Sequence, residues 1–353
     1  MNKVLVAMSG GVDSSVAAAY LKEQGYEVIG LTFIMFSQDE KKLSKKDKIA
    51  VDDAQNVAAQ LGIEHFTHNI TGEFQETIIK DFIKQYRNAR TPNPCVICNR
   101  KIKFKFLLDM AEKYNTEYIA TGHYASIEHN SKINNRHLLK KAKDFNKDQS
   151  YMLYRMSQKQ LDKTLFPMGN FSKDEIRNMA KNYGLEIHDK PDSQDICFIE
   201  DNDYIKFLEN QHENIGKPGP ILDTEGNKLG EHNGLHHYTI GQRRGLGISK
   251  PYPLYVVELD IENNAVIVGK NKKVFRNSFH IINPNWIYFD ILEEPIIVDC
   301  KIRYNSPAKL ATVYPGADKI FKVVFKDKQR AITPGQSAVF YKGDYVIGGG
   351  IIK

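Results

Sequence analysis

The chain begins with a regular alternation of short apolar segments and longer amphipathic ones. The segment 3–8 is apolar after its first residue, Lys3, as expected of a strand buried on both faces, and further strand candidates occupy 26–34, 64–70 and 117–123. Segments of helical composition separate or follow them at 14–25, 48–62, 73–89 and 103–115. Strands that alternate with helices predict an α/β fold with a doubly wound parallel sheet over roughly the first 125 residues.

The predicted secondary structure changes twice in the rest of the chain. Residues 145–200 are again of helical character, and Ser172 and Glu175 have the spacing of a capping box. Glycine- and proline-rich turns dominate from about residue 205, and short alternating runs with tight turns follow from about 275. We therefore expect an α/β domain, a small central β-rich domain and a C-terminal antiparallel β-barrel, with the bounds 1–204, 205–272 and 273–353.

Composition narrows the class of protein. The 353 residues are 41% hydrophobic and 26% charged, which is the profile of a globular chain large enough for several domains. No apolar run reaches the roughly eighteen residues that a membrane helix needs. Four cysteines make no disulfide scaffold, and no export signal is apparent, so we predict a cytoplasmic location without membrane association. The net charge of +6 is a weak indication of a polyanionic partner.

A lysine-rich interruption, 37–48, follows the second predicted strand. Runs of like charge are usually solvated loops, and that is the expectation here. The functional alternative is a flap that meets RNA phosphates.

The segment SGGVDSS, 9–15, lies between the first predicted strand and a helix N-terminus. Gly10 and Gly11 allow a sharp turn and a close approach of the backbone to a ligand, and the helix end favours an anion. The segment matches neither the Walker loop nor the dinucleotide fingerprint. Because a carboxylate among phosphate donors needs a bridging cation, Asp13 predicts Mg²⁺ at this site.

Cys95 and Cys98 form a C-x-x-C pair that the residues alone leave open to three interpretations. Structural zinc is disfavoured because no second ligand pair exists, and a thioredoxin-like pair is disfavoured because the motif does not follow the first strand. A catalytic thiol is favoured. We expect Arg100, Lys101 and Lys103, with a helix N-terminus near residue 100, to lower its pKa.

The other cysteines are single. Cys197 is flanked by Asp192 and Asp195 in a predicted turn, and by itself such a cysteine is more often buried filler. Cys300 lies in a strand-like run and is expected in the core.

Several segments together carry a family resemblance. SGGVDSS resembles the PP-loop, SGGxDS, of ATP pyrophosphatases that cut ATP between its α and β phosphates. This segment is followed, in chain order, by ARTPNPCVICNRKIKF, YIATGHYA, KDQSYMLY, DSQDICFI, GQRRGLGI, KIRY and TPGQSAVFY. From residue 3 to 353 the set resembles the tRNA-specific 2-thiouridylases, whose first domain is HUP-like.

The resemblance implies an activity and its residues. ATP and Mg²⁺ would adenylate the C2 oxygen of wobble uridine 34, and sulfur would then replace that oxygen to give 2-thiouridine, AMP and pyrophosphate. Cys197 would carry a persulfide, and Cys98 would release its sulfur and close a disulfide with Cys197. The implied ATP-binding residues are Ala7, Met8, Ser9, Gly10, Gly11, Val12, Asp13, Ser14, Phe33 and Gly122.

The resemblance also implies partners. The tRNA substrates would be those for Lys, Glu and Gln, and a cysteine desulfurase or a sulfur-relay protein would supply the sulfur. The implied tRNA-contacting residues are Asn93, Pro94, Cys95, His123, Asp148, Gln149, Ser150, Arg303, Tyr304 and Gln336. Arg243 and Arg244 are compatible with phosphate contacts or with a charged hairpin tip.

Cys95 departs from the pattern of some relatives, which have Asp at this position. Cys95, Cys98 and Cys197 together could hold a [4Fe–4S] cluster with one open iron, which is the alternative to persulfide chemistry. Two rival functions stay open. One is another PP-loop synthetase or ligase, which needs neither cysteine, and the other is a non-catalytic RNA-binding iron–sulfur protein.

His232, His236 and His237 invite a metal interpretation. We do not expect one, because Glu231 is the one carboxylate or thiol at ligand spacing from them.

Overall fold

The computed structural model describes residues 2–36, 45–133, 135–191, 196–199, 202–211 and 215–353. The lysine-rich residues 37–44 and the predicted flanking residues Asp192 and Asp195 lie outside them. Among the described residues, no helix is both long and apolar enough to cross a lipid bilayer.

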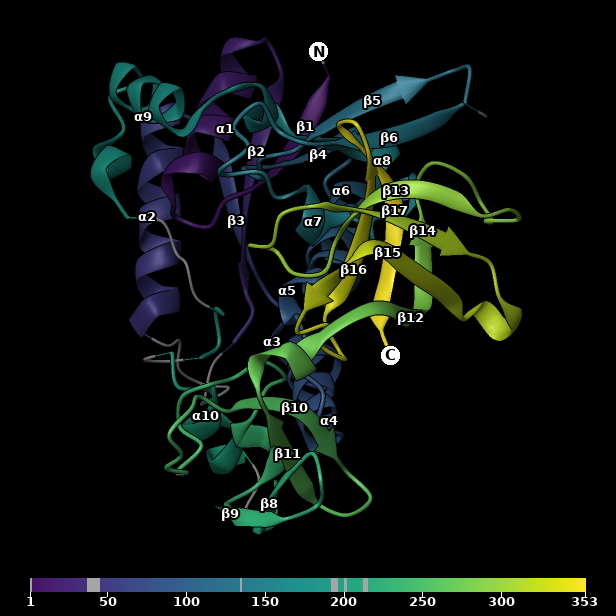
Figure 1. The fold of residues 1–353 in the computed structure, drawn as a ribbon. Coiled ribbons are helices and arrows are strands. Elements are labelled where there is room, and N and C mark those ends of the chain that lie inside the picture. The colour runs from purple at the N-terminus through teal and green to yellow at the C-terminus, as the bar shows by residue number, and fades with distance from the viewer. Residues whose placement is uncertain (1, 37–44, 134, 192–195, 200–201, 212–214) are drawn as a thin grey trace.

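The first domain is built on a parallel sheet with the strand order β3-β2-β1-β4-β7, which confirms the predicted doubly wound sheet (Figure 1). Its strands are β1 (Lys3–Ala7), β2 (Glu27–Ile34), β3 (Glu64–Asn69), β4 (Tyr118–Thr121) and the short β7 (Thr164–Leu165). Strands buried on both faces need no alternation of apolar and polar residues, and the interior of β1 is entirely buried.

Helices cover both faces of this sheet. One face packs against α1 (Val12–Glu23), α2 (Lys45–Leu61) and α9 (Lys173–Asn182). The other face packs against α6 (Phe104–Lys113), which contributes Phe104 and Leu107 to a core that also contains Leu5. Val4 and Val6 point to the first face and Leu5 to the second, as the two-residue period of a strand requires.

Shorter helical segments connect these layers. The predicted helix 73–89 is α3 (Thr71–Phe74), the π-turn η1 (Gln75–Ile79) and α4 (Lys80–Arg87) in succession. The cysteine motif lies on α5 (Pro94–Cys98), which continues through the π-turn η2 (Asn99–Lys103) into α6. The others are α7 (Ser150–Leu153), α8 (Gln158–Lys163), η3 (Pro167–Asn170) and η4 (Glu186–Asp189). The predicted capping box of Ser172 and Glu175 is confirmed at the start of α9.

The central domain consists of α10 (Tyr204–Gln211) and a small sheet of order β10-β11-β8-β9. Its strands are β8 (Gly219–Asp223), β9 (Lys228–His232), β10 (Tyr255–Asp260) and β11 (Ala265–Gly269), with a 3₁₀ turn η5 (Leu235–His237) between β9 and β10. α10 packs against the first domain: Tyr204 stacks on Tyr86 of α4, and Phe207 joins an aromatic cluster with Phe82 and Phe198.

The C-terminal sheet closes into a barrel, as predicted. Its antiparallel order is β12-β15-β14-β13-β16-β17, and β17 pairs back with β12. The strands are β12 (Phe275–Trp286), β13 (Ile296–Lys301), β14 (Lys309–Tyr314), β15 (Phe321–Arg330), β16 (Ser337–Lys342) and β17 (Tyr345–Ile352), with short turns η6 (Asn271–Val274) and η7 (Ala317–Lys319). Cys300 is buried in the barrel core, as expected.

One hairpin was not predicted. β5 (Ser126–Asn130) and β6 (Arg136–Lys140) extend the barrel sheet through the pairing of β6 with β17, although they belong to the first part of the chain. The buried Arg136 fixes the hairpin by donating to the carbonyl of Ile287 at 2.8 Å and to Asp290 at 2.7 Å. A hairpin from the first part of the chain therefore extends the barrel sheet, which joins the barrel to the first domain.

Candidate active site

The phosphate loop connects the end of β1 to the start of α1, as the sequence predicts. Gly10 has φ of +67°, and a Cβ at this position would lie 2.5 Å from the carbonyl oxygen of Ala50, so the turn and the packing both require glycine. Gly11 is the N-cap and has no side chain to cap the helix, which leaves the first-turn amide groups to an anion. Ser14 donates to the Gly11 carbonyl at 3.1 Å and accepts from the Ser9 amide at 3.2 Å.

Asp13 already has a cationic partner. Lys173, at the start of α9, donates to Oδ1 of Asp13 at 2.7 Å, and the hydroxyl of Tyr124 donates to the same oxygen at 2.7 Å. The side chain of Lys173 is only 10% exposed, so the pair is held inside the protein. Our reason for expecting Mg²⁺ at Asp13 was the need for a cation, and Lys173 meets that need, so Mg²⁺ at this carboxylate stays a prediction.

A second lysine approaches the loop from the segment after η4. Lys190 donates to the Gly10 carbonyl at 2.8 Å and forms an ion pair with Asp53 of α2. The sequence analysis missed both Lys173 and Lys190. No local motif could have identified them, because their contacts span 160 and 180 residues of the chain.

The other residues expected near ATP lie at the same edge of the sheet, where the carboxyl ends of β1, β2 and β4 meet. Gly122 follows β4 and packs on the loop, so that a Cβ there would lie 2.6 Å from the amide nitrogen of Ser14. Phe33 is near the end of β2, with its ring edge-on to His68. Met8 and Val12 are buried, Ala7 is the last residue of β1, and Ser9 lies in the loop that follows.

The helix that carries the cysteines starts earlier than expected. Pro94 occupies its first turn and Asn93 precedes it as N-cap, with its amide 3.6 Å from the sulfur of Met152. Cys98 therefore lies inside a continuous helix and not just before an N-terminus at residue 100. The helix dipole cannot lower the pKa of this thiol in the way we predicted.

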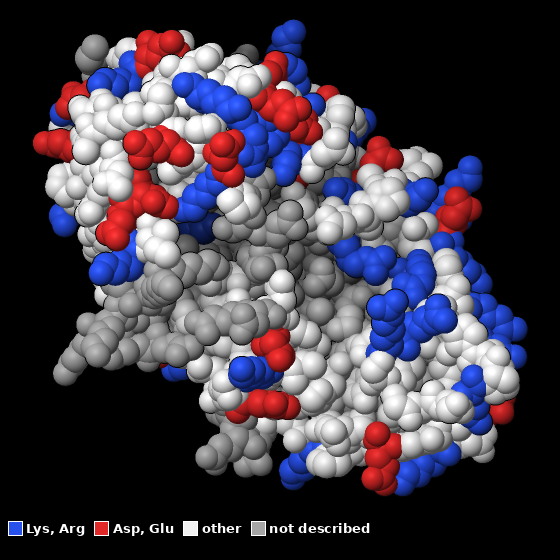
Figure 2. Space-filling model, turned by 90° about the vertical axis from the view of Figure 1, so that its left-hand side faces the viewer, with Lys and Arg blue, Asp and Glu red and all other residues white. Residues whose placement is uncertain are grey.

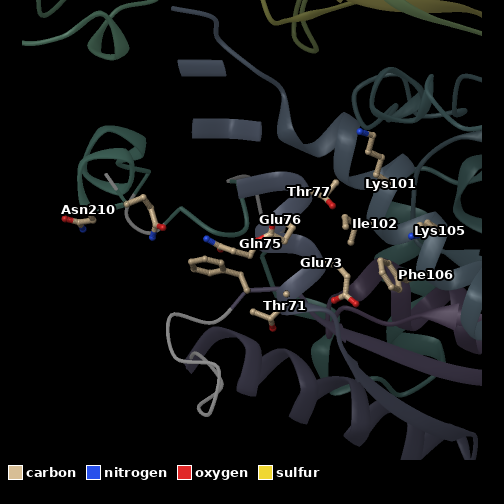
Figure 3. Close-up of a pocket in the computed structure, with 13 residues that line it drawn as sticks. Thr71, Glu73, Gln75, Glu76, Thr77, Lys101, Ile102, Lys105, Phe106 and Asn210 are labelled. Carbon is tan, nitrogen blue, oxygen red and sulfur yellow. The ribbon is translucent and has the colours of Figure 1, made fainter. Parts of the chain in front are cut away.

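Two of the three basic side chains that we expected near Cys98 have other surroundings. Arg100 donates to Asn285 at 2.7 Å, and Lys101 borders a cavity of about 890 Å³ together with Lys105 and Glu73 (Figure 3). Burial raises the pKa of Cys98 to about 12, and Lys103 opposes this. The prediction of a thiolate at Cys98 was wrong for this conformation, and the residue is a buried thiol.

Lys103 is the charge at the centre of the cysteine group. Burial alone would lower the pKa of its ammonium, but Cys98, Cys95 and Cys197 raise it, and the net direction is upward. Burial, and next the charge of Lys103, lower the pKa of His123 to about 3. His123 is therefore a neutral imidazole beside Lys103, and its Nδ1 is 2.7 Å from the hydroxyl of Thr121.

Cys197 is exposed, in contrast to the buried Cys98. Its neighbours Phe198 and Ile199 are buried in the cluster that also contains Cys98 and Ile102, so the turn that presents Cys197 is anchored beside the cysteine helix. Cys98 and Cys197 interact electrostatically, and neither is in a disulfide in this structure. The structure thus brings together Cys95, Cys98 and Cys197, although Cys95 and Cys197 are 102 positions apart in sequence.

The residues expected to contact tRNA have different environments. Asp148 is buried, where it accepts from the amides of Ala142 and Ser150, and the Ser150 hydroxyl donates to its other oxygen at 2.8 Å. Ser150 has no exposed surface. These two side chains shape the start of α7, and the contact of residues 148–150 with tRNA stays a prediction. Gln149 accepts from the Tyr124 amide at 2.9 Å.

The barrel residues lie closer to the surface. Arg303 and Tyr304 follow β13 and are half-buried, and Tyr304 faces Tyr151 with ring centroids 5.9 Å apart. Gln336 donates to the carbonyl of Thr91 at 2.9 Å, so it fixes the segment that leads into the cysteine helix. Thr91 also pairs with Thr239 at 3.1 Å, and the three domains therefore meet just before the cysteines.

Figure 2 shows a face of the molecule that is hollowed in its middle. Lys and Arg side chains gather on the right-hand part of this view with few acidic side chains among them. A basic flank beside a hollow is suited to a phosphate backbone.

Comparison with known families gives matches along almost the whole chain. Residues 2–201 match a family model described as tRNA methyl transferase HUP domain, 205–270 a tRNA methyl transferase PRC-barrel domain, and 276–352 an aminomethyltransferase beta-barrel domain.

Curated relatives match over their full length. A tRNA-specific 2-thiouridylase MnmA of Halothermothrix orenii is 57% identical over 100% of this chain and 99% of that protein. Proteins of the same description from Caldanaerobacter subterraneus subsp. tengcongensis and Acetivibrio thermocellus are 51% and 49% identical, over 100% and 99% of this chain and 98% and 99% of theirs. A solved 4-thiouridine synthetase–RNA complex with bound ATP aligns with a TM-score of 0.33 and 19% identity over 61% of this chain and 51% of that one, which is too weak to bear on function.

Proposed function

Because the chain belongs to the family of tRNA-specific 2-thiouridylases, we propose that it activates the C2 oxygen of uridine 34 with ATP and replaces it with sulfur carried by Cys197. The enzyme is a tRNA sulfurtransferase that binds ATP and tRNA. The residue assignment rests on one observation. Cys98 and Cys197 both interact electrostatically with the buried ammonium of Lys103.

The first step needs the phosphate loop. The C2 oxygen attacks the α-phosphorus of ATP, the bond to the bridging oxygen breaks, and pyrophosphate leaves. The amide groups at the start of α1 hold the negative charge that develops on the phosphates. Lys173 and Lys190 lie beside the loop and offset the negative charges of Asp13 and Asp53, which would otherwise repel the phosphates. Adenylation turns a poor leaving group, the carbonyl oxygen, into a phosphate ester that leaves readily.

The second step needs the two cysteines. The terminal sulfur of a persulfide on Cys197 attacks C2, and AMP leaves with the former carbonyl oxygen. The Cys98 sulfur, as thiolate, then attacks Sγ of Cys197, which breaks the S–S bond to the transferred sulfur and forms a Cys98–Cys197 disulfide. The transferred sulfur stays on C2 as the thiocarbonyl of 2-thiouridine. A cellular thiol must reduce the disulfide before the next turnover.

The resting state of Cys98 fits this order of events. As a buried thiol it resists oxidation until it is needed. Lys103 lowers its pKa and is the group that favours its thiolate form. Cys197 is exposed and can receive sulfur from another protein.

A [4Fe–4S] cluster is the alternative sulfur carrier. Cys95, Cys98 and Cys197 would be its ligands, and the electrostatic contact of all three with Lys103 fits a group of thiolates that needs a compensating charge. When bound, the cluster would supply an open iron site for sulfide. Iron and acid-labile sulfide analysis after anaerobic purification distinguishes the two routes, because an iron-free protein with full activity excludes the cluster.

The finer details of cofactor and partners are part of the proposal. Mg²⁺ would accompany the phosphates of ATP, with Asp13 as a ligand if Lys173 moves. The substrates would be the tRNAs for Lys, Glu and Gln, bound along the basic flank of Figure 2. A cysteine desulfurase or a relay protein would load Cys197.

Mass spectrometry of tRNA nucleosides tests the function. A deletion strain should lack 2-thiouridine derivatives, and the wild-type gene should restore them. The same spectra separate thiolated from methylated uridine, which matters because the matching family models are described as methyl transferases. Restoration of a methylated uridine without thiolation, or no change in the nucleosides, would contradict the proposal. ATP–pyrophosphate exchange with and without tRNA distinguishes another PP-loop synthetase.

A further inference from the structure

The central domain contains a group of potential metal ligands that the sulfur-transfer site does not use. Glu209 on α10 and the neighbouring His236 and His237 of η5 place one ligand atom each within 4.8 Å of one another. We did not expect this group from the sequence, because the carboxylate lies far upstream of the histidines and only Glu231 was near them.

His236 has a buried imidazole whose two nitrogens lack hydrogen-bond partners. Its side chain is 3% exposed, and among the described residues neither Nδ1 nor Nε2 has a hydrogen-bond partner. Two glycines make room for the ring, because a Cβ at Gly216 or Gly234 would lie 2.7 Å from its Nδ1. A buried polar group without a partner is destabilising, so an imidazole kept in this state suggests an absent ligand.

The distances suit a tetrahedral ion. Oε1 of Glu209 lies 3.4 Å from Nε2 of His237 and 3.8 Å from Nε2 of His236. Ligand atoms about 2.0–2.1 Å from a tetrahedral Zn²⁺ are about 3.3 Å apart, so small side-chain movements would bring these atoms to coordination distance. The longer distance is beyond a hydrogen bond, so the carboxylate does not already satisfy His236.

Nearby residues of the same types are satisfied by other partners. Both ring nitrogens of His232 are engaged, Nε2 with the carbonyl of Asn264 at 3.0 Å and Nδ1 with the amide of Gly234 at 3.0 Å. Glu231 pairs with Lys228 at 2.8 Å. Among the described residues, Glu209, His236 and His237 are therefore the group with ligand atoms close enough to hold an ion.

We propose that Glu209, His236 and His237 bind one Zn²⁺, with water in the fourth position. Two imidazoles and a carboxylate are a common ligand set for this ion. The site is open to solvent on the side of Glu209, whose side chain is 53% exposed, so the ion can enter.

The ion would join α10 to η5. The opposite contacts of α10 reach the catalytic domain, because Phe207 packs on Phe198 with centroids 5.2 Å apart, next to Cys197. A bound ion would thus fix the helix that supports the turn of the sulfur-carrying cysteine. The role of the ion would be structural, and the ion would take no part in the sulfur-transfer steps.

Zinc titration of the full-length, chelator-stripped protein tests the site. Calorimetry should give one zinc site with a Kd of about 1 µM or below in the wild type. The variant Glu209→Gln changes only an exposed carboxylate, and His237→Gln removes a partly exposed ligand. Each should weaken this site by at least about tenfold. Glu231→Gln is the matched control and should bind as the wild type does.

Thiols are the competing zinc ligands, so Cys197→Ser is titrated in parallel. The proposed site must survive Cys197→Ser, and Co²⁺ bound there must lack the intense near-ultraviolet thiolate absorption. Zinc should also raise Tm in the wild type and in Glu231→Gln, and not in Glu209→Gln. Absence of zinc binding, wild-type affinity in both Glu209→Gln and His237→Gln, or loss of the site in Cys197→Ser would overturn the proposal.

Discussion

The ammonium of Lys173 lies 2.7 Å from Oδ1 of Asp13, so the phosphate loop contains its own counter-ion. The pair joins the first turn of α1 to the first turn of α9 across 160 residues. It neutralises a carboxylate that would otherwise repel phosphates, and in the proposed mechanism it places a lysine where pyrophosphate leaves.

Replacing Lys173 by Ala should therefore weaken ATP use. Asp13 would keep its negative charge without the cation, and the loop would repel phosphate. We expect pyrophosphate release in the presence of tRNA to fall by about ten- to a hundredfold in kcat/KM. Lys181→Ala, an exposed lysine on the same helix, is the control and should be unchanged. Equal rates for the two variants would show that the ion pair has no part in ATP use.

The contact of Gly122 with the loop gives a second prediction. A methyl group at Gly122 would press on the amide of Ser14, at a distance of 2.6 Å for an unrelaxed backbone. Gly122→Ala should reduce ATP affinity and lower the free energy of unfolding by about 1–3 kcal/mol. Gly72→Ala has no atom within 4 Å of the added methyl and serves as control. Calorimetric ATP titration and denaturant unfolding provide both readings.

The burial of Cys98 predicts an order of thiol reactivity. With a pKa of about 12, the thiolate fraction of Cys98 at pH 8 is about one in ten thousand, whereas Cys197 is exposed. Iodoacetamide at pH 8 should label Cys197 well before Cys98, as peptide mass spectrometry can follow. Because Lys103 lowers the pKa of Cys98, Lys103→Met should slow the labelling of Cys98 further. Labelling of both thiols at one rate in the folded protein would contradict this account.

His123 predicts a pH dependence of stability. Its pKa is lowered to about 3, chiefly by burial, whereas the unfolded chain has the ordinary value of 6.5. Above pH 6.5 both states are neutral, and below it only the unfolded state binds the proton. The free energy of unfolding should therefore fall by up to about 1.4 kcal/mol per pH unit below pH 6.5.

Denaturant unfolding of the wild type and His123→Gln between pH 7 and pH 5 measures that contribution. The difference in unfolding free energy between the two should shrink as the pH falls. A difference that stays constant over this range would mean that His123 titrates alike in both states.

The local features of this site could be predicted from sequence, because each depends on neighbours in the chain. The phosphate loop needs only a strand, two glycines and a helix, and the capping box of Ser172 needs only Glu175. The secondary-structure class of each of the three domains likewise follows from the period of apolar residues and the positions of turns.

Long-range contacts could not be predicted in this way. Lys173, Lys190 and Glu209 look like ordinary surface residues in the sequence, and only the fold brings them to Asp13, Gly10 and the histidines. The thiolate prediction for Cys98 failed for a related reason. The number of basic residues nearby says nothing of their direction, and burial outweighed the one charge that faces the thiol.

The central claim is that the phosphate loop activates the uridine and the two cysteines deliver the sulfur. It is tested most directly by measuring pyrophosphate and 2-thiouridine in the same reaction with purified enzyme, tRNA, ATP and a sulfur donor. Cys98→Ser and Cys197→Ser should still release pyrophosphate and form no 2-thiouridine, Asp13→Ala should do neither, and the core variant Cys300→Ala should do both. Normal formation of 2-thiouridine by Cys98→Ser or Cys197→Ser would contradict the account.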